Sequence, residues 1–351
     1  MYKAVIFGIQ GTKLTDEEKE FFKREKPIGF ILFARNIENK TQLKSLVHDL
    51  RESVKNKNAP ILIDQEGGRV ARLKEPHWYH PPAARIFGDI AGKNIKDAKL
   101  ACTLNAQILA HELIEMGINV DCAPLVDVPI KNANNVIGDR AFCHDPLIIT
   151  ELAESMIKGM DSKGVNHILK HIPGHGRSLL DSHFELPVID TKLSTLMESD
   201  FIPFIKLNKS RWAMTAHIIY EDIDSFNPAT HSKAVIKVIR NEINFKGILI
   251  TDCITMQALR EGPQVNAQKS FDAGCDLVLF SKPDLKDMKE ISSISPTLTK
   301  TQLELIDKNP KTSSQESPEI LFGKLNELLK IYGVKDLVYH QDPTDWNHGN
   351  A

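Results

Sequence analysis

Long apolar runs are missing from this chain of 351 residues. No stretch of about 18 consecutive apolar residues occurs, so we expect no transmembrane helix and no membrane partner. The apolar run near the N-terminus, Ala4–Phe7, is too short for the core of a signal peptide, and no small-residue cleavage site follows it. The sequence therefore predicts a cytoplasmic protein.

Cysteine and excess charge are also scarce. The five cysteines are odd in number and widely spaced, and they form no Cys-x-x-Cys pair, which favours reduced thiols over a disulfide framework. Lys and Arg together number 44 against 46 Asp and Glu, so no basic excess suggests a nucleic-acid partner. Hydrophobic residues at 42% and charged residues at 26% are typical of a folded globular chain.

Short apolar runs alternate with longer segments of helical period. Continuous apolar runs of this kind are typical of strands that are buried on both faces of a parallel sheet. The predicted strands are 4–9, 29–35, 60–67, 118–128, 166–174, 212–220, 247–252 and 276–280. The predicted helices are 16–26, 40–56, 97–117, 146–164, 193–208, 232–244 and 264–274. Three of these helices end in a glycine that suits a left-handed closing residue: Gly117, Gly164 and Gly274.

Eight strands that alternate with helices predict an α/β fold. A doubly wound sheet would need a glycine-rich nucleotide turn after the first strand, and "GIQGTK" (8–13) is too short for that motif. A (β/α)8 TIM-type barrel fits the count better, with first strands that could be irregular. We expect one catalytic domain over residues 1–335, including C-terminal helices, and a weakly ordered tail over 336–351.

Polar residues lie in or at the carboxyl ends of the predicted strands, where barrel enzymes carry their catalytic groups. They are Asp64, Glu66, Asp127, Lys170, His171, His217 and Asp252. Asp252 follows a fully apolar strand, so its carboxylate could attack an anomeric carbon; a helix N-cap is the structural alternative. For Asp64 with Arg72, and for Asp139-Arg140, sugar binding and a loop-holding ion pair both remain open.

The stretch "KHIPGHGRSLLDSH" (170–183) concentrates three histidines. His171 and His175 are four residues apart, but Pro173 and the neighbouring glycines disfavour the helix that a two-histidine metal motif needs. The G-K-[ST] ending of a phosphate loop is absent as well. Asp181, two residues before His183, could orient that imidazole and stabilise its protonated form, as an acid–base device requires.

Five stretches together resemble one family. They are "DQEGGRVARL", "IGDRAF", "KHIPGHGRSLLDSH", "PATHSKAVIKVIRNEINFKGILITDCITM" and "DAGCDLVL". In this order they are similar to the bacterial β-N-acetylhexosaminidases of glycoside hydrolase family 3, in the single-domain cytoplasmic form. The resemblance implies Asp252 as nucleophile, His183 as acid/base and Asp181 as its partner. It implies N-acetylglucosamine binding by five further residues: Asp64, Arg72, Arg140, Lys170 and His171.

The implied reaction is retaining hydrolysis of terminal β-linked N-acetylglucosamine. The implied substrate is GlcNAc-1,6-anhydro-muramic acid, with or without peptide, in peptidoglycan recycling. No cofactor and no metal are expected, and we expect a monomer whose partner is a small carbohydrate. Three positions depart from the family pattern: Ile172 replaces a usual Phe, Cys253 a usual acidic residue, and Thr230-His231-Ser232 a more common Thr-Phe-Ser.

Three alternatives stay open from the sequence. The first is phosphorolysis, because a histidine acid/base repels an incoming phosphate less than a carboxylate does. The second is a metal-dependent hydrolase that uses His171, His175, His183 and Asp252. The third is a sugar-binding protein with a decayed site, which the unusual Cys253 motivates.

Overall fold

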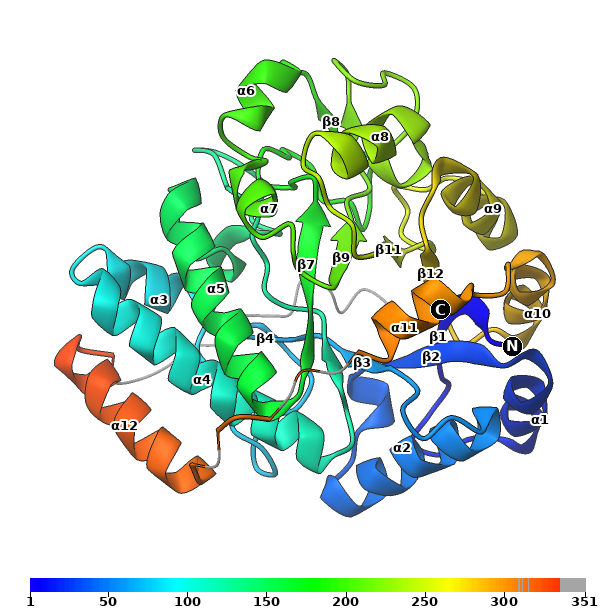
Figure 1. Cartoon of the computed structure of the whole chain (residues 1–351), viewed down its shortest axis with the longest axis horizontal. Helices are drawn as coiled ribbons and strands as arrows, with labels where there is room; N and C mark the ends of the chain where they lie inside the picture. Colours follow the sequence, from blue (N-terminus) through cyan, green and yellow to red (C-terminus); the bar gives the residue numbers. More distant parts are fainter. Residues whose placement is uncertain (309, 311, 315, 335–351) are drawn as a thin grey trace.

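The computed structural model describes residues 1–308, 310, 312–314 and 316–334, so the predicted tail lies outside the described residues. Its centre is a closed barrel of eight parallel strands in the order β1-β12-β11-β9-β7-β6-β3-β2 (Figure 1). The barrel strands are β1 (Lys3–Gly8), β2 (Pro27–Leu32), β3 (Ile61–Ile63), β6 (Val120–Asp121), β7 (Asn166–Ile172), β9 (Trp212–Thr215), β11 (Ile248–Cys253) and β12 (Leu277–Phe280). Each predicted strand overlaps one of these, which confirms the (β/α)8 fold.

The first strands are nearly regular. β1 closes the barrel by pairing in parallel with both β2 and β12, and its register against β2 shifts once, between Lys3 and Ile6. The apolar side chains of each strand divide between the barrel interior and the layer under the helices. In β1, Ile6 belongs to the interior cluster, whereas Val5 and Phe7 pack in the outer cluster. This two-sided burial explains why the strands are continuously apolar.

Helices surround the barrel on its outside (Figure 1). They are α1 (Asp16–Glu25), α2 (Lys40–Val54), α3 (Ala84–Ala91), α4 (Ile95–Glu115), α5 (Pro146–Lys163), α8 (Lys233–Asn241), α9 (Pro263–Ala273), α10 (Leu285–Ile294), α11 (Lys300–Ile306) and α12 (Pro318–Ile331). Gly117, Gly164 and Gly274 adopt φ of 80°, 89° and 111° after α4, α5 and α9, as predicted from their positions. None of the helices in the described part of the chain is long and apolar enough to span a membrane.

The prediction of one helix over 193–208 is wrong. The segment forms two short helices, α6 (Leu193–Met197) and α7 (Ile202–Lys206). Pro203 lacks the N–H that a continuous helix would bond to the Ser199 carbonyl, and its ring clashes with that turn. The chain turns instead, with the Phe201 N–H bonded to the Leu196 carbonyl at 2.9 Å.

Short elements lie outside the barrel sheet. Two pairs of short strands form small sheets, β4 (Gln65–Gly67) with β5 (Val70–Ala71) and β8 (Val188–Ile189) with β10 (Ile219–Tyr220). Three 3-10 turns complete the described elements: η1 (Ala34–Asn36), η2 (Gly138–Arg140) and η3 (Ala229–His231). Arg140 is the last residue of η2.

Candidate active site

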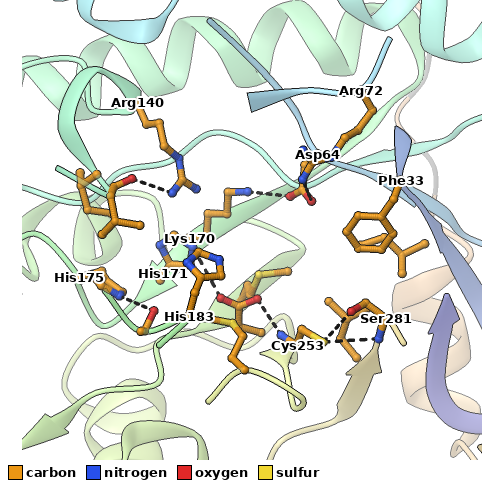
Figure 2. Close-up of a pocket in the computed structure, with 18 residues that line it drawn as sticks. Phe33, Asp64, Arg72, Arg140, Lys170, His171, His175, His183, Cys253 and Ser281 are labelled. Carbon is orange, nitrogen blue, oxygen red and sulfur yellow. Dashed lines mark hydrogen bonds and ion pairs between the residues drawn. The ribbon is translucent and has the colours of Figure 1, made fainter. Parts of the chain in front are cut away.

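A pocket opens at the carboxyl ends of the barrel strands (Figure 2). Seven of the eight predicted site residues line it, and the eighth, Asp181, is hydrogen-bonded to one of them, His183. The seven are Asp64, Arg72, Arg140, Lys170, His171, His183 and Asp252. They come from β7, β11, the segment after β3 and three loops, which are far apart in the sequence. The structure therefore brings all the predicted site residues together.

Buried charges of both signs form one side of the pocket. Lys170 Nζ lies 2.9 Å from Asp64 Oδ1 and 2.6 Å from Glu66 Oε1. Arg140 donates two hydrogen bonds to Glu66, both of 2.8 Å. Arg72 donates to Asp64 Oδ2 at 3.2 Å. Bidentate and charge-assisted bonds of this kind fix the orientation of each group, and the same groups can donate to and accept from sugar hydroxyls.

The cations keep both carboxylates ionised. Burial by itself raises the pKa of Glu66, but the charges of Arg140 and Lys170 outweigh it and lower the pKa to about 2. Burial likewise raises the pKa of Asp64, but the charges of Lys170 and Arg72 outweigh burial, so the pKa ends below its usual value. Asp64 is thus a charged acceptor inside a largely desolvated pocket.

The two open interpretations of Asp139-Arg140 separate in the structure. Asp139 forms an ion pair with Arg69 at 2.7 Å, which holds the loop. Arg140 turns the other way, toward Glu66 and the pocket. The neighbours therefore have different roles, structural for Asp139 and within the pocket for Arg140.

Asp127 orients His171. Its Oδ2 lies 2.8 Å from His171 Nδ1, and its Oδ1 accepts the backbone N–H groups of His171 at 3.1 Å and His175 at 2.6 Å. Because a carboxylate can only accept here, Nδ1 is the protonated nitrogen, and Nε2 faces Asp252 Oδ2 at 3.9 Å. Asp127 is predicted from the sequence to lie at a strand end, without a role in the site.

Asp252 occupies the end of β11 and is not a helix cap. The next helix, α9, begins only at Pro263 with Gly262 as its N-cap residue. Asp252 Oδ1 accepts the Cys253 N–H at 2.7 Å. Burial raises the pKa of Asp252, but the neighbouring imidazoles of His171, His217 and His183 outweigh burial and hold the pKa below its usual value. The carboxylate is consequently ionised at neutral pH, as a nucleophile must be.

Asp181 and His183 form the predicted dyad. His183 Nδ1 lies 2.7 Å from Asp181 Oδ1, which also accepts the His183 backbone N–H at 2.9 Å. Burial raises the pKa of Asp181, yet its bonds to His183 bring the pKa below the usual value. With Nδ1 held by a carboxylate, the exchange of a proton with a ligand falls to Nε2.

Backbone hydrogen bonds hold the loop that carries the dyad on two sides of the pocket. On one side the Asn134 N–H donates to the Ser178 carbonyl at 2.8 Å. On the other, the Gln257 N–H donates to the His183 carbonyl at 3.2 Å. His175 joins the ends of the loop through a 2.9 Å contact with Ser182 Oγ, and burial lowers the pKa of His175 to about 4. These contacts make His175 part of the structure of the loop.

Within the described ranges, no group of three or more His, Cys, Asp and Glu side chains is arranged to hold a metal ion. His171 lies on β7, which continues to Ile172, so His171 and His175 do not share a helix face. Their rings meet edge to face with centroids 5.4 Å apart.

The opposite wall of the pocket was not predicted. It is largely apolar and includes Ile31, Phe33, Met214, Met256, Leu279 and Ser281. The Cys253 thiol lies within 2.8 Å of Ser281 Oγ and 3.0 Å of Thr255 Oγ1. Apolar strand residues carry no sign in the sequence that distinguishes a pocket wall from a core.

The comparisons with known proteins agree with this geometry. The family model described as "Glycosyl hydrolase family 3 N terminal domain" matches residues 3–311. A beta-hexosaminidase of Bordetella avium (strain 197N) is 34% identical over 291 residues, which are 81% of this chain and 82% of the relative. A beta-hexosaminidase of Actinobacillus pleuropneumoniae serotype 3 (strain JL03) is 34% identical over 306 residues, 86% and 87% of the two chains.

Solved structures extend the likeness to the whole fold. NagZ from Neisseria gonorrhoeae in complex with N-trifluoroacetyl-D-glucosamine is 30% identical with a TM-score of 0.82, and the match covers 95% of this chain and 98% of that one. The fold and pocket thus define a barrel glycosidase of the β-hexosaminidase type. The chain belongs to glycoside hydrolase family 3.

Proposed function

We propose that this protein is a retaining exo-β-N-acetylglucosaminidase that forms a covalent glycosyl-enzyme on Asp252. The observation that carries the proposal is the shared pocket of an ionised Asp252, an Asp181–His183 dyad and the charged cluster around Asp64. The relatives named beta-hexosaminidase and the NagZ structure that holds N-trifluoroacetyl-D-glucosamine support this sugar.

In the first step the Asp252 carboxylate attacks the anomeric carbon as the bond to the leaving oxygen breaks. His183, protonated at Nε2, gives its proton to that oxygen, and Asp181 stabilises the imidazolium beforehand. In the second step a water molecule attacks the same carbon, His183 takes the proton of that water, and Asp252 leaves. Two displacements at one carbon retain the β configuration.

Sugar binding falls to the charged side of the pocket. Asp64 offers carboxylate oxygens to hydroxyl groups, and Lys170, Arg72 and Arg140 offer donors. His171, held by Asp127, presents Nε2 between this cluster and Asp252. We propose GlcNAc-1,6-anhydro-muramic acid, with or without peptide, as the substrate of a cytoplasmic monomer in cell-wall recycling.

Trapping of the intermediate tests the proposal. A 5-fluoro N-acetylglucosaminide, or a 2-deoxy-2-fluoro glucoside, slows the second step, so mass mapping should find the sugar on the peptide that contains Asp252. Label on any other residue, or inactivation without label, would contradict the mechanism. Product analysis in phosphate buffer separates the alternative, because N-acetylglucosamine 1-phosphate as the product would identify a phosphorylase.

A further inference from the structure

Three large apolar side chains remain exposed on the loop that carries His183. Leu179 is 65% exposed, Leu180 39% and Phe184 54%. They are exposed even though the loop is seated by backbone hydrogen bonds to residues 130 and 134 on one side and 257 and 258 on the other. Exposed apolar groups beside an active site mark a surface that a ligand can cover.

Phe184 is held by the same turn as the catalytic dyad. The Asp181 carbonyl accepts the N–H groups of Phe184 and Glu185, both at 3.0 Å, while the Asp181 side chain holds His183. The Phe184 ring lies beside the imidazole, with centroids 6.5 Å apart and planes inclined by 60°. The position of this ring is therefore linked to that of the proton donor.

The chemistry of the reaction places the leaving group next to this ring. A general acid must lie within hydrogen-bond reach of the glycosidic oxygen. In the proposed reaction, the sugar that stays on the enzyme binds next to the charged cluster. The leaving group, on the other side of the glycosidic oxygen, then extends past His183 along the exposed face of the loop.

We propose that Phe184 determines specificity for the leaving group, with Leu180 completing an apolar platform. This inference rests on the proposed function. The ring stacks on the C–H face of a cyclic leaving group, such as a second sugar. A short acyclic alcohol offers a smaller apolar surface, so the ring stabilises it less. Recognition is by shape and apolar contact, because the side chains of Phe184 and Leu180 are both apolar.

The test compares two glycosides whose leaving groups have similar acidity but different size: N,N′-diacetylchitobiose and 2,2,2-trifluoroethyl β-N-acetylglucosaminide. Phe184→Ala should lower kcat/KM for the disaccharide about five- to tenfold and leave the trifluoroethyl glycoside nearly unchanged. Phe184→Tyr should restore the disaccharide rate. Phe322→Ala, at a 40% exposed phenylalanine on α12, is the matched control and should change neither rate.

Two further readouts separate the outcomes. The pH profile of Phe184→Ala should match that of the native protein, because the variant keeps the dyad. Equal loss on both glycosides, or no loss on either, would overturn the proposal. A change only in self-association, measured by sedimentation velocity, would show that the platform is a contact between copies and would also overturn it. If the native protein cleaves neither glycoside, the proposed function itself fails, which is a distinct result.

Discussion

At the scale of single residues, the two proposed catalytic groups differ in how their surroundings prepare them. Asp252 is partly buried, with its side chain 20% exposed, and three imidazoles hold its pKa low. His183 depends on one bonded carboxylate, Asp181, at 2.7 Å. A usual retaining glycosidase has two carboxylates in these roles. A histidine avoids a second negative charge beside the attacking Asp252, which suits a pocket that already holds two ionised carboxylates, Asp64 and Glu66.

Substitution of the proposed acid should depend on the leaving group. In His183→Ala, glycosides with a sugar leaving group should lose about 100- to 10,000-fold in kcat/KM, because the departing oxygen needs a proton. A 4-nitrophenyl glycoside should lose much less in its first step, because nitrophenolate leaves unaided. Steady-state rates on both substrates provide the check, and an equal loss on both would assign His183 to binding instead.

Cys253 allows the charge beside the nucleophile to be varied. A carboxylate at this position would disfavour the ionised form of Asp252 and raise its pKa. In Cys253→Asp the acidic limb of the kcat/KM profile should therefore move to higher pH. Cys253→Ser keeps a neutral group near Ser281 and should leave the limb in place. A limb that moves to lower pH in the Asp variant would show that another group controls it.

At the scale of elements, the predictable features are those that depend on near neighbours in the chain. The buried strands appear as continuous apolar runs in the sequence. Because the carboxyl ends of barrel strands share one face, the positions of Asp64, Lys170 and Asp252 near strand ends predict that they lie on that face. Local steric rules also explain the one wrong helix, which is divided before Pro203. The role of Asp127 could not be predicted, because its partner His171 is 44 residues away and only the closed barrel brings them together.

The dyad loop needs glycine where it passes the segment after β6. A Cβ on Gly176 would lie 2.0 Å from the Val128 carbonyl oxygen. Gly176→Ala should therefore prevent the loop from seating, lower kcat/KM at least tenfold and cost about 1–3 kcal/mol of unfolding free energy. Gly262→Ala is the matched control, because a Cβ there meets nothing within 4 Å. Kinetics and thermal unfolding of both variants test this, and a fully active Gly176→Ala protein would contradict it.

At the scale of the whole molecule, the charged cluster links distant parts of the barrel. Glu66 and Arg140 are 74 residues apart in the chain, and Asp64 and Lys170 are 106 apart. No local pattern predicts such pairs, so the sequence indicated the members of the site without the network that joins them. The network forms only when the barrel closes. Its ion pairs therefore exist only in the folded state and contribute to the free energy of unfolding.

Because the charged cluster exists only in the folded state, the free energy of unfolding should change with pH in the acidic range. The folded pKa of Glu66, about 2, lies below its ordinary value of 4.5. A carboxylate with a lowered folded pKa stabilises the fold above its unfolded pKa, and that contribution disappears as pH falls from about 4.5 to about 2. Its size is about 3 kcal/mol. Glu66→Gln removes the titrating group, so its unfolding free energy should fall less steeply with pH over this range.

Denaturant unfolding at several pH values measures the effect. Because Glu66→Gln also leaves Arg140 and Lys170 with one carboxylate fewer, its stability at pH 7 should be lower than that of the native protein, and the two curves should converge toward pH 2. Glu20→Gln is the matched control, since the Glu20 side chain is 75% exposed in a surface pair with Lys23 at 3.7 Å, and its curve should follow the native one throughout. Parallel curves for Glu66→Gln and the native protein would show that Glu66 does not contribute to acid sensitivity. The charged cluster would then have a role in sugar binding, but the titration of Glu66 would not change the free energy of unfolding.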